Sequence, residues 1–351
     1  MKKKKMTIYI FGAGASKASQ IGVNKPKLIS PLVNDLFEDQ YTPYAKEVNV
    51  EVSDLNHYKT DFRKAGLTLE EWLTKWWLDT QNLDPQFLRG ERADFGKILY
   101  YFWRLFSKIS TTYDKNNLYR IFLQKVKKTR QPFGLISFNY DLLLDKAVKE
   151  IMGINLINDL RSYTTANTKY IKVHGSVNWL IPARFSDPKP LVEHYQDGAT
   201  NIRYELAINS IFNGDMLSLK NLFVVDPNSS DLQDLNFIGN HVFDGKYFYP
   251  LMFMPLTIKQ YELIEKFNES IVSEAKSLIK QADEIFLIGY RATDDIAHDI
   301  LKEARKGTRL SVVGLSSSYQ IQQKLLNKHK NLTLGFAVNN GFAKFIETYW
   351  H

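Results

Sequence analysis

Short runs of apolar residues alternate along this chain with longer stretches of helical periodicity. Five runs are rich in β-branched and aromatic residues, which is typical of buried strands. They are Thr7–Phe11, Phe133–Phe138, Lys169–Val173, Glu284–Ile288 and Thr308–Val313. Strands that alternate with helices form parallel sheets with right-handed crossovers. The pattern therefore predicts an α/β fold built on a doubly wound parallel sheet.

The stretch between the first two predicted strands, residues 29–130, is helical in period and rich in aromatic residues. Thr68 and Glu71 have the spacing of a capping box, in which each side chain accepts a hydrogen bond from the backbone amide of the other residue. The helix that follows carries Trp72 and Trp76 on one apolar face. We expect these aromatic side chains to form a core and not a surface on which bases stack.

These differences in composition and periodicity predict three parts of the chain. Residues 1–28, 131–180 and 250–351 should form a Rossmann-like domain, and residues 29–130 a helical insertion. Residues 181–249 are polar and rich in Asn, Asp and Pro, which predicts an irregular or β-containing inserted subdomain.

Composition excludes several classes of protein. The 351 residues are 44% apolar and 13% aromatic, which is typical of a globular chain. The chain contains no run of about 18 uncharged apolar residues, so no membrane span is predicted. We expect a cytoplasmic location. The absence of cysteine excludes disulfides and cysteine-ligated zinc. The net charge of +8 suits a phosphate-bearing partner, but the Lys2–Lys5 run supplies part of it, so direct binding of nucleic acid is not expected.

Small and polar residues follow each predicted strand. Ligands of parallel sheets bind beyond the carboxyl ends of the strands, so we expect these residues to line one crevice. They are Gly12–Ser16, Asn139–Asp141, His174–Ser176, Gly289–Tyr290 and Gly314–Ser317.

The turn Gly12-Ala13-Gly14-Ala15-Ser16 lets a diphosphate approach the backbone closely. The amides and the dipole of the following helix would receive its charge, and Ser16 could add a hydroxyl donor. Lys17 stands in place of the third glycine of the usual G-x-G-x-x-G spacing. The alternative is a glycine-rich turn that binds no ligand.

Asn139 and His174 are the candidate polar groups at the ends of two strands. The Asn139 amide can both donate and accept hydrogen bonds, and Asp141 is expected to point the same way. The alternative for this segment is an Asx turn that caps the helix beginning near Leu142. His174 is either a proton acceptor or a structural hydrogen-bonding group. The other six histidines have no paired metal-ligand spacing, so no metal site is predicted.

Four of these segments, taken in order, resemble the motifs of sirtuin-like proteins. More narrowly, the chain resembles the sirtuin-like NADases of bacterial antiphage defence over about residues 7–320. The segments are Gly12-Ala-Gly-Ala-Ser16, Ser137-Phe-Asn-Tyr-Asp141, Val173-His-Gly-Ser176 and Ile288-Gly-Tyr290. The resemblance implies that Asn139 and His174 are catalytic and that Gly12, Ala13, Gly14, Ala15 and Ser16 bind phosphate. It also implies that Asp141, Gly289 and Tyr290 belong to the nucleotide site.

The resemblance implies hydrolysis of NAD+ to nicotinamide and ADP-ribose, with NAD+ as the substrate and no further cofactor. The four zinc-binding cysteines of sirtuin deacylases are absent, so no zinc is expected and the helical insertion stands in place of the zinc module. The expected protein is a gated effector that depletes cellular NAD+. Its gate would be homo-oligomerisation or a separate sensor of the ATPase, Argonaute or nucleotide-sensing type. The alternatives are a catalytically silent subunit that senses NAD+ or ADP-ribose, and a protein deacylase or ADP-ribosyltransferase.

Overall fold

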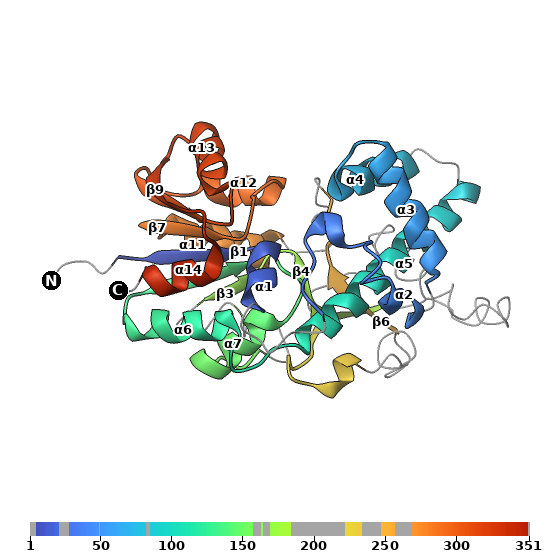
Figure 1. The fold of residues 1–351 in the computed structure, drawn as a ribbon, viewed down its shortest axis with the longest axis horizontal. Helices are drawn as coiled ribbons and strands as arrows, with labels where there is room; N and C mark the ends of the chain where they lie inside the picture. Colours follow the sequence, from blue (N-terminus) through green and yellow to red (C-terminus); the bar gives the residue numbers. More distant parts are fainter. Residues whose placement is uncertain are drawn as a thin grey trace.

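A computed structural model describes residues 5–20, 28–48, 50–81, 85–156, 163, 169–183, 222–233, 247–256 and 268–349. Figure 1 shows a lobe built around a sheet and a second lobe of helices, with β4 between them. The strands are β1 (Thr7–Phe11), β2 (Phe133–Ser137), β3 (Tyr170–Lys172), β4 (Gly175–Ala183), β5 (Phe223–Val224), β6 (Tyr247–Met252), β7 (Glu284–Ile288), β8 (Thr308–Val313) and β9 (Leu332–Val338). The main helices are α1 (Ala13–Ser19), α2 (Pro43–Lys46), α3 (Val52–Lys64), α4 (Leu69–Gln81), α5 (Pro85–Ser110), α6 (Leu118–Lys128), α7 (Leu143–Met152), α11 (Ser273–Lys280), α12 (Asp295–Lys302), α13 (Ser318–Lys328) and α14 (Gly341–Thr348).

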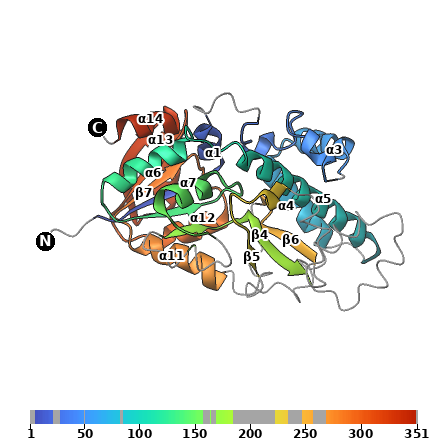
Figure 2. The same ribbon diagram turned by 90° about the horizontal axis from the view of Figure 1, so that it is seen from below.

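The larger sheet has six parallel strands in the order β3-β2-β1-β7-β8-β9. The strands β2 and β7 are buried along their whole length, as expected for parallel strands covered on both faces. Figure 2 shows α6 and α14 on one side of this sheet and α11 on the other. The doubly wound α/β fold predicted from the sequence is confirmed, with all five predicted strands in one sheet.

The order of the strands reverses between β1 and β7. From β1 the chain proceeds outward through β2 to β3, and it returns to the other side of β1 to form β7, β8 and β9. The carboxyl ends of β1 and β7 therefore mark the topological switch point, where open α/β sheets bind their ligands.

The helical lobe contains α2 to α5. The capping box at the start of α4 is present: the Glu71 amide donates to Thr68 Oγ1 at 3.2 Å, and the Thr68 amide donates to Glu71 Oε2 at 2.8 Å. The Trp76 ring contacts Phe95 with centroids 4.3 Å apart and Tyr58 with centroids 5.3 Å apart. These aromatic side chains form a core, as predicted. None of the helices in the described ranges is long and apolar enough to cross a bilayer.

A second sheet has the antiparallel order β5-β4-β6. The chain leaves the large sheet at the end of β3 and enters the small one at Gly175, where φ is +79°. A Cβ at Gly175 would lie 2.1 Å from the Leu251 carbonyl oxygen, so this close approach requires glycine. His174 consequently lies at the corner between the two sheets. Most of the predicted subdomain 181–249 lies outside the described residues, and the division into three parts stays a prediction.

Candidate functional site

The loops that follow β1 and β7 meet at the switch point. The Gly12 amide donates to the Ile288 carbonyl at 3.1 Å, and the Gly14 amide donates to the Gly289 carbonyl at 2.9 Å. A Cβ at Gly12 would lie 2.6 Å from the Cβ of Tyr290. Gly289 has a φ of +59°, and a Cβ there would lie 2.1 Å from the Ala15 nitrogen. Glycine at these positions is therefore required for the two loops to pack.

Several amides of the glycine-rich turn already have acceptors. Besides the two amides that donate toward β7, the Ala15 amide donates to the Gly12 carbonyl at 2.9 Å. Ala13 and Gly14 are half-buried, whereas Ala15 and Ser16 are buried. Packing between loops accounts for the close backbone approach that the sequence predicts, and phosphate binding by this turn stays a prediction.

Asn139 is held against the glycine-rich turn. Its Nδ2 donates to the Gly12 carbonyl at 3.0 Å and to Ser16 Oγ at 2.9 Å, and it lies 3.2 Å from the Tyr119 hydroxyl. The Ser16 and Tyr119 hydroxyls are 3.1 Å apart, and all three side chains are buried. The Ser16 hydroxyl thus takes part in an internal network. Tyr119 could not be recognised from the sequence, because it lies on an amphipathic helix, where a tyrosine is ordinarily a core residue.

Asp141 lies two residues before the first residue of helix α7. Its Oδ1 accepts from the Leu143 amide at 3.0 Å, so the Asx-turn alternative describes its geometry. Burial raises the pKa of the Asp141 carboxyl, while the nearby Lys172 ammonium opposes that rise. A contribution of Asp141 to a nucleotide site stays a prediction.

A fully buried ion pair lies next to Asp141. Lys172 Nζ lies 2.9 Å from Asp145 Oδ2, with neither side chain exposed, and it also donates to the Asp141 carbonyl at 2.8 Å. Asp145 accepts from the Tyr163 hydroxyl at 3.1 Å and from the Tyr170 hydroxyl at 2.9 Å. The carboxylate is thereby compensated by three donors, as a buried charge requires.

His174 and Tyr290 share two neighbours. Nε2 of His174 lies 3.4 Å from Asp294 Oδ2, and the Tyr290 hydroxyl donates to the same oxygen at 2.5 Å. The Phe138 ring stacks on Tyr290 with centroids 4.3 Å apart and meets the His174 ring at 90° with centroids 4.8 Å apart. The sequence pattern did not single out Asp294, because an Asp before a helix is typical of an N-cap.

Segments after four strands are therefore brought together. Asn139 and Tyr290 both contact Gly12, and His174 shares Phe138 and Asp294 with Tyr290. The segment Gly314–Ser317, which we expected in the same crevice, lies at the end of β8, one strand beyond the switch point. The Gly314 amide donates to Val338 and its carbonyl accepts from Gly341, on the β9 side. Its place in the crevice therefore stays a prediction.

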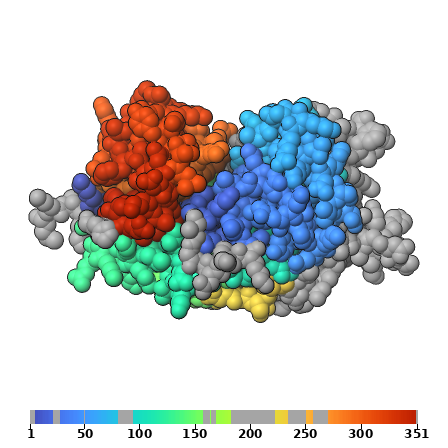
Figure 3. Space-filling view, viewed as in Figure 1, coloured from blue at the N-terminus to red at the C-terminus, as the bar shows by residue number. Residues whose placement is uncertain are grey.

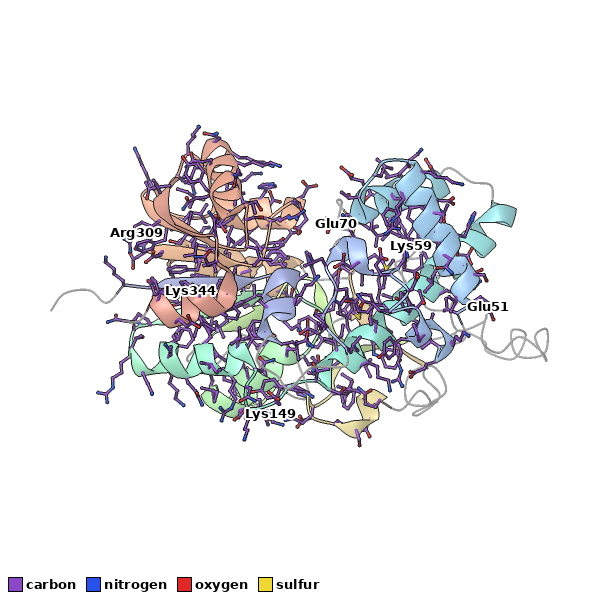
Figure 4. The ribbon with its side chains drawn as sticks, viewed as in Figure 1. Glu51, Lys59, Glu70, Lys149, Arg309 and Lys344 are labelled. Carbon is purple, nitrogen blue, oxygen red and sulfur yellow. The ribbon has the colours of Figure 1, made fainter. Side chains whose placement is uncertain are left out.

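The site lies where the two lobes meet. Burial raises the pKa of the Tyr140 hydroxyl well above its usual value, and the charges of Glu70 and Asp294 add to that rise. Tyr140 therefore lies within electrostatic reach of both the helical lobe and the loop before α12. Figure 3 shows a notch in the surface between the orange part, which includes α12, and the blue part, which includes α4. Glu70 lies on the side of the helical lobe that borders this gap in Figure 4.

The described residues contain no group of three or more histidine or acidic side chains that could hold a metal ion. His298, three positions after Asp295, pairs instead with His329, with Nδ1 and Nε2 3.0 Å apart. No described contact connects this pair with the glycine-rich turn.

No protein-family model and no curated protein sequence matches this chain. The solved structures similar to it include Sir2 proteins. An ADP-ribose complex of a mutant Sir2 homologue has 13% identity and a TM-score of 0.46, covering 99% of this chain and 91% of that one. A Sir2 homologue–NAD complex has 12% identity and a TM-score of 0.44, covering 99% and 89%. Sir2Tm bound to a propionylated peptide has 12% identity and a TM-score of 0.40, covering 98% and 92%.

Proposed function

We propose that this chain is an NAD+ glycohydrolase that splits NAD+ into nicotinamide and ADP-ribose. The observation that carries the proposal is the meeting of Asn139, His174 and Tyr290 around the Gly12 turn at the switch point. The segments that carry these residues are also those whose motifs resemble the sirtuin-like NADases.

The reaction places modest demands on acid–base chemistry. The C1′–N bond breaks through an oxocarbenium-like state, and nicotinamide leaves as a neutral molecule, so no general acid is needed. Water then forms the new C1′–O bond and gives up a proton. A histidine, with an ordinary pKa of about 6.5, can accept that proton at neutral pH. In this proposal His174 takes the proton, either from the water or from a ribose hydroxyl.

Asn139 would orient the reacting ribose. Its Nδ2 is directed at the Gly12 carbonyl and Ser16, which fixes the plane of the amide. The proposal assigns to Oδ1 the acceptance of a hydrogen bond from the ribose or from the attacking water. Binding of the diphosphate near Gly12 supplies remote binding energy that can be used to distort the ribose.

A catalytically silent subunit that senses NAD+ or ADP-ribose is the second candidate. The engagement of Asn139 Nδ2 by three internal oxygen atoms favours it, because such a network gives the residue a structural role. Tight ADP-ribose binding without turnover would support this candidate. A deacylase or ADP-ribosyltransferase would instead release nicotinamide only when an acyl-peptide or acceptor protein is present.

An unrestrained NADase would exhaust the NAD+ of its own cell, so we propose that the activity is gated. The gate would be a homo-oligomer or a separate sensor protein of the ATPase, Argonaute or nucleotide-sensing type, within antiphage defence. The turnover of NAD+ by the isolated chain, compared with turnover in the presence of the neighbouring gene's product, tests this proposal. Full activity of an isolated monomer would refute it.

Release of nicotinamide from NAD+ by the purified chain, alone and with that partner, tests the activity itself. Asn139→Ala and His174→Ala should each lower the rate by about a hundredfold or more. His57→Ala is the matched control, because the His57 side chain is 71% exposed on the helical lobe, and it should retain the wild-type rate. Full activity in both Asn139→Ala and His174→Ala would contradict the assigned roles.

A further inference from the structure

Asp294 is a buried carboxylate that contacts two residues of the proposed site. Its Oδ2 accepts from the Tyr290 hydroxyl at 2.5 Å and lies 3.4 Å from His174 Nε2. Its Oδ1 accepts from the Ala297 amide at 2.9 Å and so caps helix α12. Asp294 is 5% exposed and His174 is 6% exposed, so little water screens the attraction between them.

A carboxylate beside an imidazole has two effects. It stabilises the imidazolium form, and a hydrogen bond from one ring nitrogen leaves the lone pair on the other. We propose that Asp294 is the positioning residue of His174, because its carboxylate lies beside Nε2 and stabilises the ring when the ring takes a proton. The proposal rests on the NAD+ glycohydrolase function and adds to it a residue that does not touch the substrate.

Tyr290 and His174 compete for one oxygen of Asp294, Oδ2. The 3.4 Å separation from His174 exceeds the usual 2.7–3.2 Å of an N–H···O bond, while the Tyr290 contact is short. A carboxylate oxygen that accepts strongly from a hydroxyl has less negative charge to offer a second donor. Tyr290 therefore weakens the attraction between the Asp294 carboxylate and the His174 imidazole. Removal of the Tyr290 hydroxyl should strengthen that attraction.

Among the residues that the structure describes, titratable groups near the imidazole come from several elements. They are Asp294 at the start of α12, Tyr290 in the preceding loop, Tyr140 after β2, and Glu70 on α4, whose charge acts on Tyr140. Tyr140 stays neutral at the pH of the experiment because burial raises its pKa. Asp294 is thus a charged group in direct contact with His174 in the described part of the chain.

Titration of His174, followed by NMR of the full chain, tests the proposal with no need for turnover. The resonance is assigned with His174→Gln. Asp294→Asn should lower the midpoint by about one pH unit, and Tyr290→Phe should raise it. Asparagine is as good an N-cap as aspartate, so Asp294→Asn preserves the start of α12. Asp295→Asn is the matched control, because this exposed neighbour undergoes the same change of charge and should leave the midpoint where it is.

Kinetics of NAD+ cleavage provide the second readout. Asp294→Asn should lower kcat about tenfold or more with little change in KM, and should move the acid limb of the pH profile to lower pH. A shifted midpoint in a chain that never cleaves NAD+ would refute the proposed function but support the positioning contact. Equal midpoints in Asp294→Asn and Asp295→Asn, or an unchanged midpoint in Tyr290→Phe, would overturn the positioning role.

Discussion

The buried pair of Lys172 and Asp145 supplies the sharpest prediction about stability. Neither side chain is exposed, and the two charged atoms are 2.9 Å apart. Removal of one partner leaves an uncompensated charge in the protein interior, which costs about 3–5 kcal/mol. The variants Lys172→Met and Asp145→Asn should lose different amounts of unfolding free energy within that range. After Lys172→Met, the carboxylate retains the Tyr163 and Tyr170 hydroxyls, so we expect a cost of about 3 kcal/mol.

Asp145→Asn leaves the Lys172 ammonium buried without its paired carboxylate, bonded to the Asp141 carbonyl and near the Asp141 carboxyl group. We expect this variant to lose about 5 kcal/mol, a large part of the total stability of a typical domain. The double variant contains neither charge. It should be more stable than Asp145→Asn alone, with a coupling free energy of at least about 2 kcal/mol between the two positions.

Urea unfolding at neutral pH, followed by tryptophan fluorescence, measures these free energies. Asp299→Asn is the matched control, because it breaks the exposed pair with Lys302, in which the atoms are likewise 2.9 Å apart. Exposed pairs contribute about 0–1 kcal/mol. An Asp145→Asn variant no less stable than Asp299→Asn, or a double variant that loses the full cost of both single changes, would refute the reasoning.

Three further predictions concern the network, the loop contact and the effect of pH. Tyr119→Phe removes a hydroxyl next to Asn139 Nδ2 and should cost about 1–3 kcal/mol, measured by urea unfolding; a loss no larger than in an exposed Tyr→Phe variant would contradict it. Gly12→Ala should displace the loop after β7, because its Cβ would lie 2.6 Å from the Tyr290 side chain. This variant should lower NAD+ turnover more than about tenfold. Gly66→Ala should leave turnover unchanged, because no atom lies within 4 Å of the added Cβ. Burial, with the adjacent imidazole, lowers the pKa of His329 to about 4. The unfolded chain then binds more protons below pH of about 6.5, so thermal stability should fall from there toward pH 4, and less in His329→Gln.

Much of the larger sheet could be predicted from the sequence, because strands buried on both faces are continuous apolar runs. β1 has the predicted bounds, Thr7–Phe11, and β7 and β8 also match their predicted ranges. The sixth strand, β9, was missed. It is the edge strand, and its middle residues are exposed, so burial imposes no clear pattern on it.

The candidate site shows a similar division. Strand ends could be located from the pattern, and the structure brings four of the five predicted segments together. Tyr119 and Asp294 could not be identified, because their roles depend on contacts with residues 20 and 120 positions away in the chain. Sequence spacing also could not distinguish a glycine needed for ligand binding from a glycine needed for packing against a neighbouring loop. Gly12 and Gly289 are needed for packing, because a Cβ at either position would clash with the adjacent loop.

Hydrogen–deuterium exchange of the full chain with and without ADP-ribose tests the central claim most directly, namely that the segments at the β1–β7 switch point form one nucleotide site. The account predicts that ADP-ribose slows exchange together in the segments around Gly12–Ser16, Asn139–Asp141, His174–Ser176 and Gly289–Asp294. Protection confined to another part of the chain, or no protection at an ADP-ribose concentration that saturates binding, would contradict it.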